Sequence, residues 1–295
     1  MHMLNALTID VEDYYQVAAF DSMIRLEDWD RYESRVERNT HRILELLDKH
    51  KTRGTFFVLG WVAERHPKLV RDIHACGHEI GSHGYAHQRV YTQGPDQFRE
   101  ETRKSKSILE DIIGRPVLGY RAATYSITKE SLWALDVLLD EGFLYDSSIF
   151  PIRHDLYGIP DYHRFCHVLD GRNGNGLIEV PLSTLQLAGL NIPIAGGGYF
   201  RIFPYGFIRW GLRRLNEKEN QPAVMYLHPW EIDPGQPRIK GNPLSRFRHY
   251  HNLNTTEEKL VRLIKDFNLG TMLEVLCSRG IIKVNEEKKA WTVVS

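Results

Sequence analysis

Two histidines four residues apart are the first sign of chemistry in this chain. His83 and His87 follow a short apolar run that ends at residue 81. If the segment turns as a helix, residues four apart lie on one face, and both imidazoles point the same way. Neutral imidazole is the most common metal-binding side chain, and such a pair needs a carboxylate or a water to complete a site. The alternative is a pair of surface or supporting histidines.

Carboxylates that can complete such a site follow the first apolar run of the chain. Residues 4–9 are typical of a buried strand, and Asp10, Glu12 and Asp13 come directly after it. One metal ion needs fewer acids than this, so one can act as a base while another binds the ion. Side chains alternate along a strand, which puts Glu12 on the same side as Asp10, whereas Asp13 turns inward if the chain bends at Tyr14. Glu12 and Asp13 both remain candidate ligands.

Three further polar residues follow apolar segments later in the chain. Arg121 can pair with a carboxylate through its planar guanidinium, and Asp146 offers another acid. His228 stands at the end of a predicted strand over residues 223–227. Each has an ordinary structural alternative: a surface ion pair for Arg121, a turn or helix cap for Asp146, and a strand cap for His228.

The elements that must position these residues alternate between strand and helix. Apolar runs at residues 4–9, 54–59, 79–82, 177–182 and 223–227 predict strands, and helical spacing predicts helices over residues 39–50, 67–76, 97–113, 129–141 and 256–267. Asn39 or Thr40 is the expected cap of the first helix. This rhythm indicates an α/β fold with a mainly parallel sheet and helices outside it. In barrels of this class reactive groups gather at the carboxyl ends of the strands, where the candidates lie.

Composition limits the function classes. The chain has 295 residues with 38 basic and 38 acidic side chains, so no overall field favours nucleic acid. The basic runs at residues 209–214 and 238–248 fit solvated helix faces. Three distant cysteines indicate neither a disulfide framework nor a thiolate zinc site. There is no signal-peptide pattern and no apolar run long enough to span a membrane, so we expect a cytoplasmic protein of unknown oligomeric state.

Five segments in order carry a family resemblance. Residues 8–13, 83–87, 119–126, 145–148 and 225–230 resemble the motifs of the NodB-homology polysaccharide deacetylases, carbohydrate esterase family 4. Residues 196–201, 228–234 and 246–250 resemble the branch associated with exosortase (PEP-CTERM) exopolysaccharide loci. Any one segment is a weak signal, but the five in order, together with these later segments, are a strong one.

The resemblance implies a fold and an activity. The fold would be a distorted (β/α)7 barrel of parallel strands in a single domain over residues 1–295, with the barrel at about 4–230 and an extension at about 231–295. The activity would be metal-dependent hydrolysis of acetyl groups, chiefly N-acetyl, on a sugar polymer or its precursor in exopolysaccharide biosynthesis. His83 and His87, with Glu12 or Asp13, would bind a divalent cation, with zinc preferred and cobalt, nickel or manganese also suitable.

The same resemblance implies roles for four other residues. Asp10 would be the general base, and Arg121 would orient it. His228 would be the general acid, and Asp146 would support this histidine. The aromatic residues Tyr14, Tyr15, Tyr125 and Trp230 are candidates for stacking on sugar rings, with core packing as the alternative.

The chain departs from the family pattern at two places. The common motif has two adjacent aspartates, whereas Val11 here separates Asp10 from the next acids. Ala123 stands where many relatives carry proline, which puts an oxyanion contact from the amide of Thr124 or Tyr125 in question. Two rival functions are a hydrolase of a non-sugar C–N bond, such as a cyclic ureide, and an inactive sugar-binding barrel.

Overall fold

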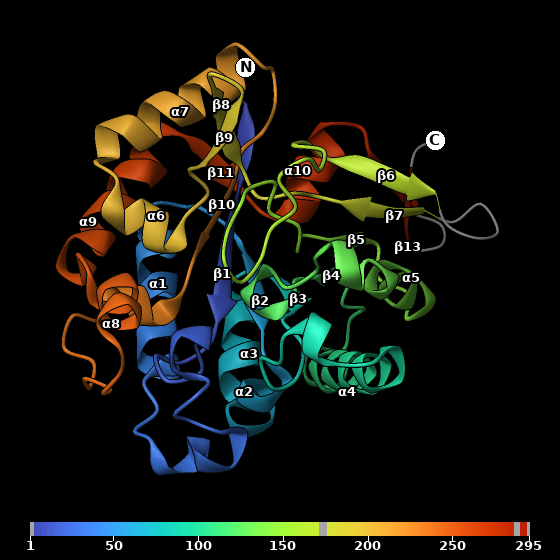
Figure 1. Cartoon of the computed structure of the whole chain (residues 1–295). Helices are drawn as coiled ribbons and strands as arrows, with labels where there is room; N and C mark the ends of the chain where they lie inside the picture. Colours follow the sequence, from blue (N-terminus) through green and yellow to red (C-terminus); the bar gives the residue numbers. More distant parts are fainter. Residues whose placement is uncertain (1–2, 171–175, 286–289, 294–295) are drawn as a thin grey trace.

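The computed structural model describes residues 3–170, 176–285 and 290–293 (Figure 1). The strands of its main sheet are β1 (Leu4–Val11), β2 (Thr55–Val58), β3 (Glu79–Ser82), β4 (Gly119–Tyr120), β5 (Tyr145–Asp146), β6 (His167–Asp170), β7 (Gly176–Glu179), β10 (Val224–Leu227) and β11 (Asn268–Gly270). They follow the order β10-β1-β2-β3-β4-β5-β7-β6, and β11 also pairs with β1. Every neighbouring pair is parallel except β6 with β7. The sheet curls into a half-barrel, which confirms the predicted distorted α/β barrel.

The central strand β1 is buried along almost its whole length. Its residues 5–11 are all buried, and it pairs with β10 along residues 6–9 and with β2 along residues 8–11. Because these strands are parallel, the carboxyl ends of β10, β1, β2, β3 and β4 lie along one edge. The polar residues that follow these strands therefore meet at that edge.

Helices lie on the outside of the curled sheet (Figure 1). They are α1 (Val36–Lys49), α2 (Gly60–Arg65), α3 (Pro67–Ala75), α4 (Pro95–Ile113), α5 (Trp133–Asp140), α6 (Gly197–Ile202), α7 (Tyr205–Glu217), α8 (Pro243–Tyr250), α9 (Leu253–Asp266) and α10 (Met272–Ser278). The long helix α4 begins with proline and ends at Gly114, which adopts a φ of 65°. In the part of the chain that the structure describes, no helix has both the length and the apolarity to cross a membrane.

Helix α1 begins earlier than predicted. Asn39 and Thr40, the expected caps, lie inside the helix and are buried. The carboxylate of Asp13, at the end of β1, instead accepts hydrogen bonds from the backbone N–H groups of Arg35 (2.7 Å) and Val36 (3.1 Å). Such N–H groups have no partner within a helix, and a nearby carboxylate satisfies them. The cap comes from a distant residue, which local spacing does not reveal.

The region after residue 230 returns to the sheet. Strand β11 pairs with the first half of β1, so that Leu4, Asn5 and Ala6 face Asn268, Leu269 and Gly270. Helix α10 follows and packs against β1. The expected extension over residues 231–295 thus contributes to the central sheet, and the single-domain organisation of the chain stays a prediction.

Several short elements had no clear signal in the sequence. These are β5, β6, α6, and two antiparallel pairs: β8 (Thr184–Leu187) with β9 (Leu190–Pro193), and β12 (Ile282–Asn285) with β13 (Ala290–Val293). The three cysteines are free, as their spacing predicted.

Candidate active site

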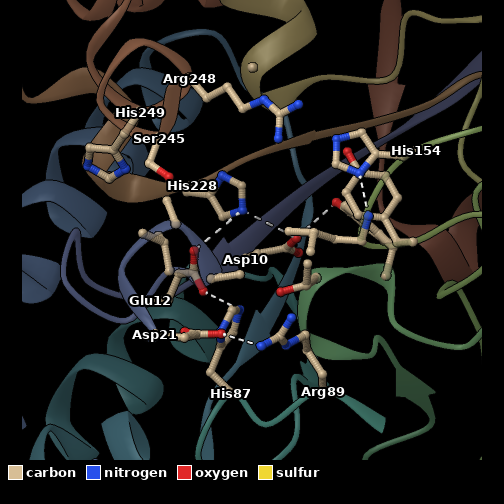
Figure 2. A pocket seen from close by; sticks show the side chains of 18 of the residues that line it. Asp10, Glu12, Asp21, His87, Arg89, His154, His228, Ser245, Arg248 and His249 are labelled. Atoms are coloured by element: carbon tan, nitrogen blue, oxygen red, sulfur yellow. Dashed lines mark hydrogen bonds and ion pairs between the residues drawn. The ribbon is translucent and has the colours of Figure 1, made fainter. Parts of the chain in front are cut away.

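The predicted residues converge at the carboxyl edge of the sheet. Asp10 lies near the end of β1, while His83, Arg121 and His228 directly follow β3, β4 and β10. A cavity of about 570 Å³ lies at this edge, and five of the predicted residues line it: Asp10, Glu12, His83, His87 and His228 (Figure 2). Residues more than 200 positions apart in the sequence therefore face one space.

Glu12, His83 and His87 form the candidate metal centre. All three are buried, and each offers one ligand atom within 4.8 Å of the other two. Glu12 Oε2 lies 2.8 Å from His87 Nε2. His83 Nδ1 lies 2.8 Å from the carbonyl oxygen of Arg121. This contact makes Nδ1 the donor and leaves Nε2 as the free lone pair, a common arrangement for metal-binding histidines.

The charges of this cluster suit a cation. Burial lowers the pKa of His83 to about 4, so its imidazole is neutral at pH 7. Burial by itself would raise the pKa of Glu12, but the charges of His87 and His228 outweigh it and hold this pKa at about 2. Burial opposes the charged form of His87, but Glu12 outweighs it and raises the pKa of His87, so a cation bound here would displace the proton of His87. Metal ligands must be deprotonated, and one carboxylate with two imidazoles is a donor set that divalent transition metals favour. The residues present therefore fit such an ion.

The segment from His83 to His87 is a loop and not a turn of helix. Gly84 adopts a φ of 74° and His87 a φ of 51°, both outside the helical range. The two rings still lie next to each other, edge to face, with centroids 5.4 Å apart. The four-residue spacing thus brings the imidazoles together through a different backbone from the one expected.

Asp13 does not join the cluster. Its oxygens accept hydrogen bonds from Ser34 Oγ and from the backbone N–H groups of Tyr14, Arg35 and Val36. These bonds direct the carboxylate to the start of α1. Of the two alternatives left open by the sequence, the geometry keeps Glu12 as the carboxylate and removes Asp13.

Asp10 and Arg121 form a buried ion pair beside the cluster. Arg121 Nη1 donates to Asp10 Oδ1 (2.8 Å) and to Thr8 Oγ1 (2.6 Å), and its Nε and Nη2 donate to the carbonyl and hydroxyl oxygens of Ser147. Tyr125 donates its hydroxyl proton to Asp10 Oδ2 (3.2 Å). Burial favours the neutral acid, but the charge of Arg121 outweighs it and lowers the pKa of Asp10. Asp10 is therefore ionised and held in one orientation.

His228 lies close to both Asp10 and Glu12 (Figure 2). Its Nε2 lies 3.5 Å from Glu12 Oε1 and 3.9 Å from Asp10 Oδ2. Its Nδ1 donates to Glu231 Oε1 at 2.7 Å. Burial opposes the charged imidazolium, but Glu12, Glu231 and Asp10 together outweigh it and raise the pKa of His228 to about 9. The imidazolium thus carries a proton on the side that faces the cavity.

Glu231, and not the predicted Asp146, is the residue that contacts His228 Nδ1. Asp146 Oδ1 accepts from the hydroxyl of Ser148 (2.5 Å), and its carboxyl group shares a hydrogen bond with Glu179. Burial raises the pKa of Asp146 to about 6 and, together with the charge of Asp146, raises that of Glu179 well above 4.5. Asp146 thus belongs to a buried acid pair beneath the site. The residue that supports His228 is Glu231, three positions further along the chain.

Two functional contacts come from residues after His228 that the sequence did not single out for these roles. Glu231 supports the imidazole, and its own Oε2 accepts from Arg201 Nε at 2.6 Å. Trp230, expected only as a sugar platform, also donates from Nε1 to Glu12 Oε1 at 3.2 Å. The sequence does carry a signal for the contact with Glu231, namely a histidine followed three residues later by a glutamate. At this spacing the glutamate side chain can reach back to the residue at the start of the turn.

Aromatic residues form part of the cavity wall. Tyr125 and Trp230 line it, whereas Tyr14 and Tyr15 belong to the hydrophobic core. His154 and Tyr157 also line the cavity and stack on each other with centroids 3.8 Å apart. The wall thus combines flat rings with the charged groups described above.

Two family models match this chain. A family model described as "Polysaccharide deacetylase" matches residues 19–138. This chain contains a polysaccharide deacetylase domain. A second model, described as "Domain of unknown function (DUF3473)", matches residues 147–277. The candidate site joins both parts, since His83, His87 and Arg121 lie in the first match and His228 in the second.

Curated relatives of the deacetylase domain share short stretches with it. The "Peptidoglycan-N-acetylglucosamine deacetylase" of Bacillus cereus is 37% identical over 75 residues, which are 25% of this chain and 27% of that protein. The "Peptidoglycan deacetylase" of Helicobacter pylori is 32% identical over 111 residues, 37% of this chain and 36% of that protein. The matched stretches thus span about a third of these relatives or less.

Solved structures resemble the whole fold. A protein described as a polysaccharide deacetylase from Mycobacterium smegmatis superposes with a TM-score of 0.60 at 22% identity, covering 93% of this chain and 89% of that one. An allantoinase superposes with a TM-score of 0.58 at 17% identity, covering 92% and 88%. At these identities the similarity establishes the distorted barrel of the deacetylase fold.

Proposed function

We propose that this protein is a metal-dependent deacetylase that hydrolyses acetyl groups, chiefly N-acetyl, on a sugar polymer or its precursor in exopolysaccharide biosynthesis. The observation that carries the proposal is one buried arrangement. A carboxylate and two imidazoles that suit a divalent cation lie beside an ionised acid, Asp10, and a charged imidazole, His228. The family match and relatives named as glycan deacetylases support the sugar substrate.

The candidate ligands of the ion are Glu12, His83 and His87. When bound there, a divalent cation, with zinc as first choice and cobalt, nickel or manganese as others, supplies Lewis acidity toward an acetyl oxygen and a water. Asp10 accepts the proton of the attacking water. Arg121 fixes the direction of its carboxylate and, through its charge, keeps Asp10 ionised.

His228 supplies the proton that the departing amine requires. Its Nε2 faces the cavity, and Glu231 holds the opposite ring nitrogen. An amine anion is a very poor leaving group, so an amide needs this acid more than an ester does. General acid catalysis of this kind typically contributes about a hundredfold or more.

The amide N–H of Thr124 is the backbone group that can donate to the oxyanion. The amide of Tyr125 already donates to the carbonyl of Ala122 at 3.1 Å. Thr124 lines the cavity, and its φ of 57° is rare for a threonine. One such donor is typically worth about 3 kcal/mol in the transition state.

The form of the cavity favours a glycan over a small ureide, although an allantoinase shares the fold. Two residues that line the cavity are more than half exposed: the side chain of Asp155 is 57% exposed, and Leu244 is 56% exposed. The site therefore opens to solvent. An open site accepts one unit of a longer chain. The inactive-barrel alternative requires a lost base, acid or ligand, and all of these are present.

Acetate release tests the proposal directly. Chelated protein, reloaded with zinc, cobalt, nickel or manganese in turn, is incubated with a panel of N- and O-acetylated glycans and with allantoin. We expect acetate from an N-acetylated glycan, and we expect Asp10→Asn to abolish it while metal content is kept. Asp111→Asn, at an exposed position of α4, is the matched control. Ring opening of allantoin, followed as its disappearance, without acetate release from any glycan would contradict the proposal, and so would unchanged acetate release by Asp10→Asn.

A further inference from the structure

Arg201 stands at the centre of a buried network behind the candidate general acid. It is 2% exposed and lies in α6, within the part of the chain that matches a domain of unknown function. Its Nε donates to Glu231 Oε2, and Glu231 Oε1 accepts from both Nδ1 and the backbone N–H of His228. The remaining donors of Arg201 reach three carbonyl oxygens around the end of α8: Arg248 (2.8 Å), His249 (2.8 Å) and His251 (2.9 Å).

Each contact in this network satisfies a group that would otherwise be unpaired. The last carbonyl groups of a helix have no partner within it, and the guanidinium supplies donors to them. Glu231 is fully buried between a guanidinium and an imidazole. His228 in turn is stacked on Trp230, with centroids 5.0 Å apart, and Trp230 is stacked on His249 at 4.2 Å. The ring of His228 is thus linked to α8 through the stacked side chains of Trp230 and His249.

We propose that Arg201 and Glu231 are positioning residues that fix the ring of His228, and that the region of unknown function thereby completes the active site. The inference rests on the proposed deacetylation and adds these two residues to it. Glu231 selects which ring nitrogen faces the cavity, and Arg201 holds Glu231 in place. Neither residue transfers a proton to substrate.

Chemical rescue separates positioning from stability. Arg201 lines the cavity, so guanidinium can enter the space left by Arg201→Ala. We expect this variant and Glu231→Gln to lower kcat at least a hundredfold with KM within threefold of wild type, and millimolar guanidinium to restore at least tenfold in Arg201→Ala. Arg164→Ala is the matched control, because it also loses an ion pair, with Glu219. It should lower the midpoint of thermal unfolding, keep its kcat, and ignore guanidinium.

A spectroscopic readout keeps this test apart from the proposed activity. Two-dimensional 1H–15N spectra of the imidazole rings of metal-free protein, assigned with His228→Gln, should show a strongly hydrogen-bonded Nδ1–H in wild type that is lost in Glu231→Gln and altered in Arg201→Ala. Wild-type protein without deacetylase activity but with this pattern defeats only the proposed function. An unchanged Nδ1–H signal in Glu231→Gln, or wild-type kcat in Arg201→Ala, overturns the positioning role.

A second feature is an apolar rim at the mouth of the cavity. Leu244 and Phe247 lie three residues apart on α8 and are 56% and 51% exposed. Ile202, also exposed, lines the cavity with Leu244. The end of Met23, another exposed side chain, lies next to Gly241 just before α8. Exposed large apolar side chains gathered at one place mark an interaction surface.

The charge around this rim has one sign. Residues 234–256 contain Arg238, Lys240, Arg246 and Arg248 but no acidic residue, in a chain whose charges balance as a whole. Arg248 pairs with Asp155 across the cavity mouth. Lys240 and Arg246 are exposed and form no ion pair within the described part of the chain. Exposed leucine and phenylalanine flanked by unpaired cations is the pattern of a surface that lies on anionic lipid.

We infer that the α8 rim, defined as Leu244, Phe247, Lys240 and Arg246, docks on the anionic surface of a membrane. The cavity then opens toward the bilayer, where a glycan carried on a lipid would be presented. This inference depends on the exposed rim and not on the proposed chemistry, so vesicle binding tests it without any substrate.

Sedimentation with vesicles is the test. We expect the full chain to bind vesicles of phosphatidylglycerol and phosphatidylcholine at least tenfold more tightly than phosphatidylcholine alone, and less tightly at high salt. Leu244→Ser with Phe247→Ser, or Lys240→Glu with Arg246→Glu, should abolish binding. Leu190→Ser, at an exposed position of β9, is the control and should bind as wild type. Absence of vesicle binding, retention by an anionic polysaccharide instead, or full binding by the α8 variants overturns the inference.

Discussion

Replacing Arg121 by methionine should expose how strongly the candidate base depends on its partner. Arg121 is fully buried and donates to Asp10, Thr8 and Ser147 through four hydrogen bonds. Methionine fills similar space but leaves the carboxylate of Asp10 buried and uncompensated. Removing one partner of a buried ion pair typically costs about 3–5 kcal/mol of unfolding free energy. With roughly 2–3 °C per kcal/mol for a chain of this size, Tm should fall by about 6–15 °C.

The double variant provides the decisive comparison. Asp10→Asn alone leaves the guanidinium without its anion and should also destabilise by about 3–5 kcal/mol. In Asp10→Asn with Arg121→Met neither charge of this pair remains, so the two losses should not add. We expect a coupling free energy of about 2–3 kcal/mol, at the upper end for residues in contact.

Chelator-treated protein keeps metal binding out of this measurement. Guanidinium denaturation followed by circular dichroism gives the free energy of unfolding of wild type, both single variants and the double variant. Two single losses that add in the double variant would refute the proposed dependence of Asp10 on Arg121. A stable Arg121→Met protein would do the same.

Three further outcomes follow from the geometry. The buried carboxyl groups of Asp146 and Glu179 have higher pKa values in the folded than in the unfolded protein. Their contribution to the free energy of unfolding is therefore present below about pH 4 and is lost as pH rises through about 6. Glu179→Gln should flatten the fall in stability between about pH 5 and 8, measured by urea denaturation. The pKa of His228 in metal-free protein should be about 9 by NMR titration, so its stabilising charge is present below pH 6.5 and is lost as pH rises through 9. His83→Ala and His87→Ala should each remove bound metal, measured by elemental analysis, whereas a fully loaded variant would exclude that residue as a ligand.

Much of the fold could be predicted because the main strands are apolar and sequential. The strands at β1, β2, β3 and β10 are continuous buried runs, and a parallel sheet leaves such runs in the sequence. Strands β4 and β5 have only two residues each, too few for any periodicity. Strand β11 is a three-residue strand that pairs with β1 from more than 260 positions away, and no local pattern reports such a pairing.

The site residues could be predicted where the position of a residue along a strand determines the direction of its side chain. Alternation predicts Glu12 on the side of Asp10, and both residues line the cavity, although β1 ends at Val11. Asp13 was misplaced because its partners, the free N–H groups at the start of α1, come from a segment more than 20 residues away. The prediction for Asp146 is wrong for a similar reason, since its neighbour Glu179 and the actual partner of His228, Glu231, come from other parts of the chain.

Anomalous diffraction from crystals soaked in zinc, recorded at the zinc edge, examines the metal centre most directly. We expect one strong peak bonded to Glu12, His83 and His87, with Asp10 and His228 on either side of it. Ligation through Asp13, or soaked crystals without density at these three side chains, would contradict the centre on which the proposed hydrolysis depends.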